Sequence, residues 1–285
     1  MSDDGEQGAK APQPDHIRFL FDPDTALMAL AGQRRRFGAT VAELSTEELE
    51  APSRCVGWTV ADVLRHGVWA DGAMQRIWSG DLSLVEGFDP RTTPDAAVRA
   101  DRAVPDDEIR RRYLTSTETM IVELESTDPE RLGRPSLSPA GPVPWWLSAV
   151  HLGWDSTIHE RDVLAPLDRA VEATADETTV ALAYSLVLVT FFSGRDPLDV
   201  QIGTVRLHCG DGPVTASTIG AAISADGGDH RSADDVVTVL EGDPVAIVDA
   251  LSGRLSPADV LHGDTALIGR LGGLARYFTS SPAPT

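Results

Sequence analysis

Cysteine is scarce in this chain of 285 residues, and long apolar runs are missing. The two cysteines, Cys55 and Cys209, lie far apart and form no metal-type spacing, which argues against a disulfide scaffold or a zinc ribbon. The longest apolar stretch, residues 180–192, is interrupted by polar side chains and is too short to span a bilayer, so a buried helix is expected there. The first residues are acidic and show no basic-then-apolar leader, so the sequence predicts a cytoplasmic protein.

Basic residues are also few. The chain has 44 Asp and Glu against 24 Lys and Arg, a formal net charge of −20, and Lys10 is its single lysine. A nucleic-acid binder needs a basic face that displaces counterions, and docking on anionic lipid needs the same charge. Neither nucleic acid nor a membrane is therefore expected as a partner. Hydrophobic residues make up 42% of the chain, enough for a folded core and too many for global disorder.

The first half of the chain shows helical periodicity. Asp24 is expected to cap the first helix, and Thr59 the second, with Asp62 completing a pattern that resembles a capping box. Residues 80–104 and 126–142 are rich in Pro and Gly and are expected to be long connections. The predicted helices cover about residues 24–44, 59–77, 105–124 and 144–164. Four helices with two long connections favour a helical bundle.

The second half has a mixed pattern, with a fifth helix that belongs to it or bridges the two halves. That helix is expected at about 177–192, strands at 205–209, 214–218 and 236–240, and further helices at 244–251 and 265–277. The predicted fold class is α+β. We expect a disordered tail at 1–20, a bundle at 21–170, a small α+β domain at 171–279 and a tail at 280–285.

One pair of side chains indicates a candidate metal site. Asp155 and His159 are four residues apart, so on a helix they share a face and can bind one metal ion. His66 lies on the inward stripe of the second predicted helix and is the candidate third ligand. Two His and one carboxylate leave coordination positions open, which is typical of a catalytic site. The alternative is a pair of buried polar residues that satisfy each other.

Neighbouring residues extend this hypothesis. His151 lies one helical turn before Asp155 and could be a fourth ligand, although a supporting group or a helix-surface histidine is favoured. Asp162 could accept a hydrogen bond from the second ring nitrogen of His159, or be an ordinary solvated residue. Cys55 has no obvious base beside it in the sequence, and a small buried thiol is the expected state.

Two longer motifs carry a resemblance to a known family. The segment SRCVGWTVADVLRH, residues 53–66, resembles the start of the second helix in mycothiol-dependent maleylpyruvate isomerase-like proteins. The segment WDSTIHERDVLAPL, residues 154–167, resembles their metal-binding helix, and short motifs at 241–246, 252–254 and 263–264 resemble their C-terminal domain. The resemblance implies a DinB-like four-helix bundle followed by a small, sterol-carrier-like α/β domain.

The resemblance also implies a function. His66, Asp155 and His159 would be catalytic residues that hold a divalent metal, with zinc favoured, and mycothiol would be the thiol cosubstrate. An open metal can bind a sulfur atom and lower the thiol pKa. The implied activity is a mycothiol-dependent isomerase or S-transferase that acts on a small electrophilic metabolite. Arg254 is the candidate anchor for mycothiol, against the alternative of a surface arginine that closes a helix.

This chain departs from the family pattern at the carboxylate, because it has Asp155 where Glu is usual. Asp is shorter, so a metal ion would lie closer to the fourth helix or be reached through water. Two alternatives therefore stay open: a hydrolase in which metal-activated water replaces the thiol, and a non-catalytic protein that binds a small molecule and retains the fold.

Overall fold

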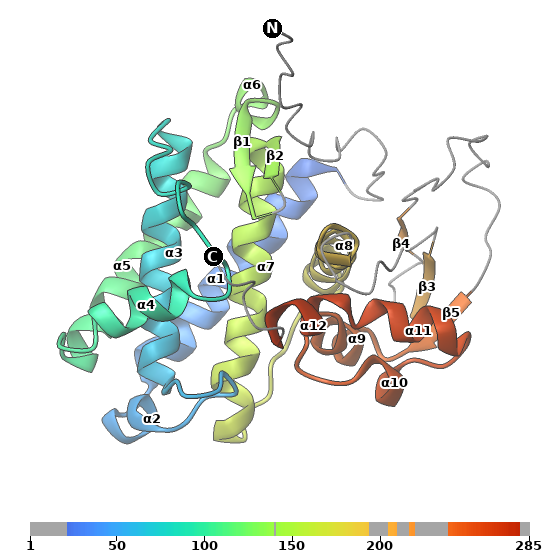
Figure 1. The fold of residues 1–285 in the computed structure, drawn as a ribbon. Helices are drawn as coiled ribbons and strands as arrows, with labels where there is room; N and C mark the ends of the chain where they lie inside the picture. Colours follow the sequence, from blue (N-terminus) through green and yellow to red (C-terminus); the bar gives the residue numbers. More distant parts are fainter. Residues whose placement is uncertain (1–21, 140, 194–204, 210–216, 220–238, 280–285) are drawn as a thin grey trace, which may run out of the picture.

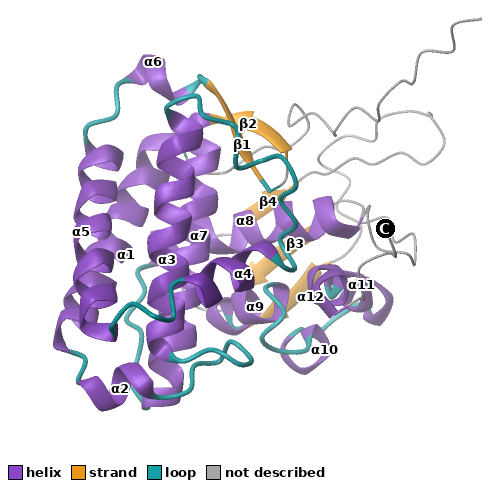
Figure 2. Ribbon diagram, turned by 60° about the vertical axis from the view of Figure 1, so that its left-hand side comes forward, coloured by secondary structure: helices purple, strands orange, loops and turns teal. Residues whose placement is uncertain are grey.

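The computed structural model describes residues 22–139, 141–193, 205–209, 217–219 and 239–279. Within these ranges a helical bundle is joined to a smaller part that contains a three-stranded sheet and short helices (Figure 1, Figure 2). The expected α+β class, with a four-helix bundle followed by a small α/β part, is confirmed. The tails expected at 1–20 and 280–285 lie outside the described residues.

Four long helices form the bundle. They are α1 (Pro23–Glu43), α3 (Val60–Trp78), α5 (Asp106–Glu125) and α7 (Trp145–Leu164). Contacts join α1 to α5, α5 to α3, α3 to α7 and α7 to α1, so the helices surround a common core. Gly153 lets α7 approach α1 closely, because a Cβ atom there would lie 2.0 Å from Leu30 Cδ2.

The helix caps follow the sequence with one correction. Asp22, and not Asp24, caps α1, and its carboxylate accepts a hydrogen bond from the Thr25 amide at 2.8 Å. Pro23 suits the first helical position because its missing amide hydrogen is not needed there. The predicted cap of α3 is confirmed, since Thr59 and Asp62 form a reciprocal capping box.

Both long connections contain regular structure that the sequence analysis did not predict. The segments are α4 (Thr93–Ala100) within 80–104, and α6 (Pro129–Leu132), β1 (Pro135–Ser138) and β2 (Gly141–Pro144) within 126–142. Helix α2 (Thr46–Glu50), between α1 and α3, was not predicted either. The prolines that suggested loops lie in the first turns of α4 and α6, where they favour a helix start. Others lie in the antiparallel β1–β2 ribbon, in which both strands are edges and tolerate a missing donor.

Helix α8 (Ala175–Ser193) bridges the two parts of the molecule. It follows the short 3-10 helix η2 (Ala165–Leu167) and packs on α1 and α7 of the bundle and on two helices of the smaller part. Its described side chains are buried on most sides, including the fully buried Tyr184, as expected of the longest apolar stretch. The domain boundary near residue 170 stays a prediction.

The smaller part has strand order β4-β3-β5. Strand β3 (Val205–Cys209) is antiparallel to β4 (Ser217–Ile219) and parallel to β5 (Val239–Gly242). The strands expected at 214–218 and 236–240 fall partly outside the described residues. Helices α9 (Pro244–Leu251), α10 (Pro257–Val260), α11 (Thr265–Leu271) and α12 (Gly273–Thr279) follow. The single helix expected at 265–277 is two helices, because the Gly272–Gly273 pair has low helix propensity.

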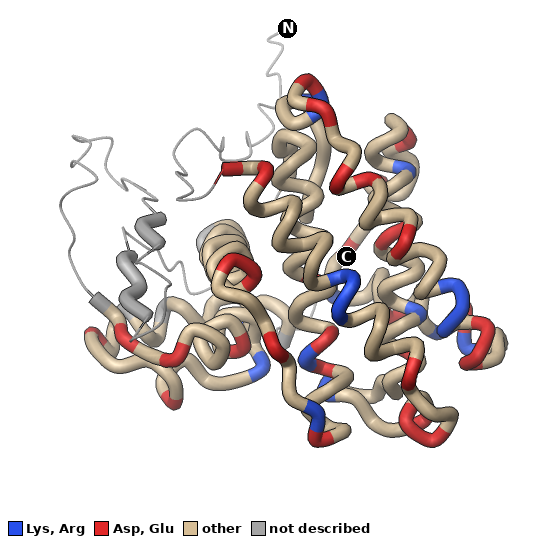
Figure 3. The backbone as a smooth tube through the Cα atoms, turned by 180° about the vertical axis from the view of Figure 1, so that it is seen from behind, with Lys and Arg blue, Asp and Glu red and all other residues tan. Residues whose placement is uncertain are grey.

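Charge is distributed over the whole fold. Figure 3 shows acidic positions in both the bundle and the smaller part, in line with the net charge of −20. Some arginines are used internally: Arg34 is 3% exposed and pairs with the buried Asp71 at 2.9 Å. No helix in the described ranges combines the length and apolar character needed to cross a lipid bilayer.

Candidate functional site

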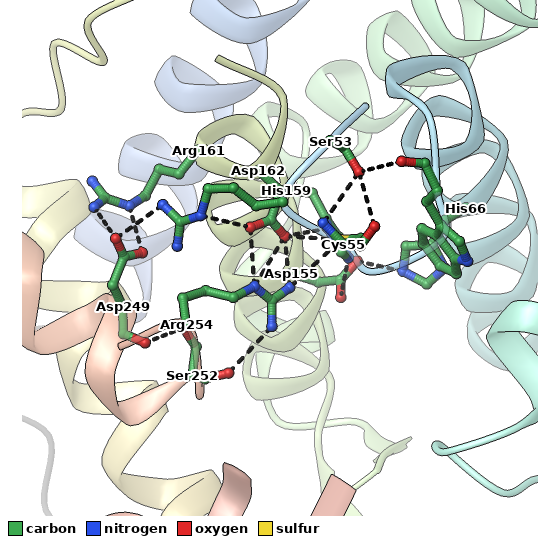
Figure 4. A network of polar contacts seen from close by, with 12 residues as sticks. Ser53, Cys55, His66, Asp155, His159, Arg161, Asp162, Asp249, Ser252 and Arg254 are labelled. Atoms are coloured by element: carbon green, nitrogen blue, oxygen red, sulfur yellow. Dashed lines mark hydrogen bonds and ion pairs between the residues drawn. The ribbon is translucent and has the colours of Figure 1, made fainter. Parts of the chain in front are cut away.

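His66 on α3 and Asp155 and His159 on α7 lie together inside the bundle (Figure 4). His66 Nε2 is 3.2 Å from Asp155 Oδ2, and His159 Nε2 is 3.5 Å from Asp155 Oδ1. One ligand atom from each residue lies within 4.8 Å of the others. The expected approach of two helices is therefore present, while the metal-binding role of the three residues stays a prediction.

The charge states of this cluster are strongly coupled. Burial by itself would raise the pKa of Asp155, but the adjacent imidazoles of His66 and His159 outweigh it and hold that pKa well below its usual range. Burial would likewise lower the pKa of His159, but Asp155, Asp162 and Cys55 raise it well above the usual value. The cluster thus holds an ionised carboxylate between two imidazoles. The negative charge of Asp155 favours a positive charge on the neighbouring imidazole of His159.

Asp162 orients the imidazole of His159. It is fully buried, and its Oδ2 lies 3.1 Å from His159 Nδ1, so the expected contact is present and the solvated alternative is wrong. Burial would raise the pKa of Asp162, but hydrogen bonds from His159 and Arg254 lower it far below the ordinary value. The ionised Asp162 therefore accepts a hydrogen bond from Nδ1–H of His159, which turns Nε2 of that ring toward Asp155.

The smaller part of the molecule reaches this site through Arg254. This residue follows α9 and donates to Asp162 from Nε at 3.0 Å and from Nη2 at 2.6 Å (Figure 4). Beside it, Asp249 of α9 accepts hydrogen bonds from Arg161 at 2.8 Å and from Arg54 at 3.1 Å. Arg254 therefore extends toward the bundle as expected, while its contact with mycothiol stays a prediction.

Sequence reasoning missed Asp249, Arg161 and Arg54 as parts of this network. All three look like ordinary charged surface residues in the sequence, and no local spacing marks them. The signal comes only from the tertiary structure, which brings Asp249 to Arg161 and Arg54, 88 and 195 positions away in the sequence.

The surroundings of Cys55 differ from the buried thiol that the sequence predicted. Its side chain is only half-buried, and its Sγ lies 3.1 Å from Asp162 Oδ2 and 3.7 Å from His159 Nδ1. The base that the sequence did not show comes from a helix 104 residues further along the chain. Cys55, His159 and Asp162 also satisfy the geometry of a metal site. The guanidinium of Arg254 lies 3.8 Å from Cys55 Sγ and binds Asp162, so it opposes a cation at this second position.

A cavity of about 200 Å³ adjoins the cluster, and His66 and Asp155 form part of its wall. The rest of the wall comes from α3, α7 and the ends of α8 and α12, together with two segments that the sequence analysis treated as connections. These are residues 84–94 and the hairpin residues 137–139. The cavity therefore has direct access to the cluster.

His151 lies in the wall of this cavity and not on an outer helix surface. Its ring is half-buried, 6.1 Å from the Trp154 ring and 5.5 Å from the Tyr184 ring between centroids. Burial lowers the pKa of His151 to about 4, so the ring is neutral near pH 7. It belongs to no group of metal-ligand geometry found within the described residues.

Trp58 covers the histidines from the 52–58 loop. Its ring centroid is 5.5 Å from that of His66 and 6.3 Å from that of His159. The indole Nε1 donates to Asp95 of α4 at 3.0 Å. The unexpected helix α4 thus holds an aromatic side chain beside the two histidines.

Comparison with known proteins agrees with this architecture. A family model described as "Mycothiol maleylpyruvate isomerase N-terminal domain" matches residues 30–164. Two crystal structures of the mycothiol-dependent maleylpyruvate isomerase, one of a histidine-to-alanine mutant, share the fold with TM-scores of 0.57 and 0.56. In both, the identity is 15%, and the alignment covers 86% of this chain and 94% of the solved one. A comparison with curated proteins gave no match. Residues 30–164, which include His66, Asp155 and His159, therefore form an N-terminal domain of the mycothiol maleylpyruvate isomerase type.

Proposed function

We propose that this chain is a divalent-metal-dependent, mycothiol-dependent isomerase or S-transferase that acts on a small electrophile. His66, Asp155 and His159 would be its metal ligands, with zinc the favoured ion. One observation carries the proposal: the three side chains converge within 4.8 Å, and two of them, His66 and Asp155, line a cavity that can hold a substrate. The match of residues 30–164 to the family's N-terminal domain supplies mycothiol as the thiol.

The donor set fits a divalent ion. Two imidazole nitrogens and one carboxylate are ligands that suit zinc and leave positions open. His159 has the supporting carboxylate that a ligand histidine usually has, because Asp162 accepts from its Nδ1. The shorter side chain of Asp155 still brings one carboxylate oxygen to each imidazole, at 3.2 and 3.5 Å. When bound, the metal would bind the mycothiol sulfur and lower its pKa, so that thiolate is present near neutral pH.

The proposed reaction needs little else from the protein. The thiolate sulfur adds to an alkene carbon conjugated with a carbonyl, a C–S bond forms, and the alkene electrons move toward the carbonyl oxygen. Rotation about the new single bond and expulsion of the thiolate give the isomer and regenerate mycothiol, whereas protonation of the adduct gives a conjugate. Trp58 lies beside the two histidines, and the neutral His151 adds a polar group to the cavity without adding charge.

Arg254 is proposed to hold the polar part of mycothiol. Its side chain is one-quarter exposed, and Asp162, Cys55 and the Ser252 carbonyl already contact its guanidinium. A cosubstrate that approaches the cysteine side of the cluster would pass this group. Mycothiol carries sugar hydroxyls and amides, which can accept hydrogen bonds from the guanidinium.

The test combines metal analysis with a thiol-dependence assay. Purified protein should contain stoichiometric metal and should convert a small cis-enone only in the presence of mycothiol, in a panel that includes maleylpyruvate, the substrate named for the solved isomerase. His66→Ala should lose the metal and lower kcat/KM by more than ~100-fold, since even groups that only support metal ligands change affinity by ~10–100-fold. Asp259→Asn, which removes an exposed carboxylate on α10, is the control and should change neither.

Each alternative gives a distinct outcome. Products that form equally well without mycothiol would reject thiol chemistry and favour a hydrolase. Sub-stoichiometric metal that His66→Ala leaves unchanged would reject the metal site and favour a protein that only binds small molecules. A mycothiol conjugate in place of an isomer would select the S-transferase.

A further inference from the structure

The wall of the cavity beside the cluster is almost entirely hydrocarbon. It is lined by aromatic and aliphatic side chains from six parts of the chain, among them Trp69, Ile77, Phe88, Leu137, Trp154 and Phe278. The remaining described wall residues include further alanines, leucines and prolines. A ligand body in this space would lose contact with water and gain contact with apolar atoms.

Polar side chains are few in the described wall. His66 and Asp155 belong to the cluster, and Ser138 and the neutral His151 complete the set. Among the described residues that line the cavity, none is Arg or Lys. The described part of the wall therefore offers no Arg or Lys to an anionic group that lies away from His66 and Asp155.

Arginines next to the wall in the sequence are already paired. Arg91, which follows the wall residue Pro90, makes a two-armed contact with Asp89 at 3.1 and 2.9 Å. Arg76, which precedes the wall residue Ile77, donates to Asp81 at 2.8 Å. A substrate carboxylate would have to displace these carboxylates before it could use either guanidinium.

We propose that this cavity selects an electrophile with an uncharged, apolar body and discriminates against dicarboxylates such as maleylpyruvate. The inference rests on the proposed function for the chemistry and deepens it by naming the substrate class. One carboxylate of a diacid could reach the metal position beside His66 and Asp155. The second would face apolar walls, and a buried charge without a partner is strongly disfavoured.

A charge series of cis-enones tests this selectivity. The methyl ester of cis-benzoylacrylic acid is neutral, cis-benzoylacrylate carries one negative charge, and maleylpyruvate carries two. All three isomerise by thiol addition and elimination, and the rate with mycothiol alone is subtracted. The neutral ester should have the highest kcat/KM, and each added carboxylate should lower it by at least about tenfold.

Binding measured without turnover separates this inference from the proposed function. Trp69 and Trp154 line the cavity, so tryptophan fluorescence can report binding of unreactive saturated analogues. Methyl benzoylpropanoate should bind more tightly than benzoylpropanoate, and phenylsuccinate should bind most weakly. Ester-selective binding without any turnover would reject the proposed function and keep the inference, whereas turnover that favours the diacid would keep the function and overturn the inference.

A charge placed in the wall should reverse the preference. Val85 lines the cavity and is 42% exposed, so Val85→Arg can be accommodated without burying the new charge. This variant should raise kcat/KM for the two acids relative to the ester by at least about tenfold, and Val85→Met should not. Val122→Arg, at an exposed position of α5 outside the wall, adds the same charge as a control. An equal gain in both arginine variants would show a long-range charge effect and overturn the assignment to the cavity.

Discussion

The two halves of helix α7 have opposite chemistry. Residues 145–154 contain no Asp, Glu, Lys or Arg, whereas residues 155–164 contain Asp155, Glu160, Arg161 and Asp162 in addition to His159. The first half packs closely on α1 and forms cavity wall, while the second half holds ion pairs with α1 and with the smaller part. The candidate site lies where the halves meet, so one helix supplies both an apolar cavity and the charges that orient its histidine.

The largest expected effect concerns stability in the charged half. Glu160 is fully buried and accepts hydrogen bonds from Arg36 at 2.9 and 3.1 Å and from Gln33 at 3.0 Å. Glu160→Ala should lower the free energy of unfolding by about 3–5 kcal/mol, because it leaves Arg36 without one buried partner. Urea unfolding measures this change, and Glu43→Ala at the exposed end of α1 is the control. A loss below ~1 kcal/mol would show that Glu177, the second partner of Arg36, is sufficient.

Asp162 and Asp249 both bind arginine, but of these two contacts with the site only that of Asp162 reaches His159. Asp162→Asn should weaken metal binding by about 10–100-fold, because His159 loses the charged acceptor at its Nδ1. Asp249→Asn changes the neighbouring arginine contacts without touching His159, so it should leave the metal affinity nearly unchanged. Titration of metal-free protein with zinc measures both affinities. Equal losses in the two variants would mean that the domain contact, and not the orientation of His159, controls metal binding.

The apolar half should be sensitive to volume where it meets α1. Gly153→Ala should destabilise the protein by about 1–3 kcal/mol, because the added methyl group would lie 2.0 Å from Leu30 Cδ2. Gly72→Ala on α3 is the matched control, since nothing lies within 4 Å of a Cβ atom there. That control should be neutral or stabilise the helix by up to ~1 kcal/mol. A thermal unfolding series distinguishes them, and equal effects would contradict the close approach of α7 and α1.

The smallest expected effect is a pH dependence at the contact between the two parts. Burial would raise the pKa of Asp249, but Arg161 and Arg54 lower it below the ordinary value of 3.8. A lowered folded-state pKa stabilises the protein above the ordinary pKa, and this stabilisation is lost as the pH falls through the lowered value. The difference in unfolding free energy between the wild type and Asp249→Asn should therefore shrink as the pH falls below 3.8. A difference that is independent of pH would show that the charge of Asp249 contributes nothing.

Part of the candidate site could be predicted because it depends on spacing within one helix. Asp155 and His159 are four residues apart, and helical geometry places them on one face whatever surrounds the helix. The cap at Thr59 and the inward position of His66 follow from equally local patterns. The helix α4 and the β1–β2 ribbon were missed, because their prolines have different meanings at a helix start, in an edge strand and in a loop.

The sequence by itself determined the bundle helices, the fold class and the pairing of Asp155 with His159, since periodicity and capping act over a few neighbouring residues. Only the tertiary structure decided that Cys55 faces His159, that Arg254 binds Asp162 and that the cavity wall is apolar. The first two contacts join residues that are 104 and 92 positions apart. They depend on how helices pack against one another, and the pattern of any single segment contains no record of its neighbours in space.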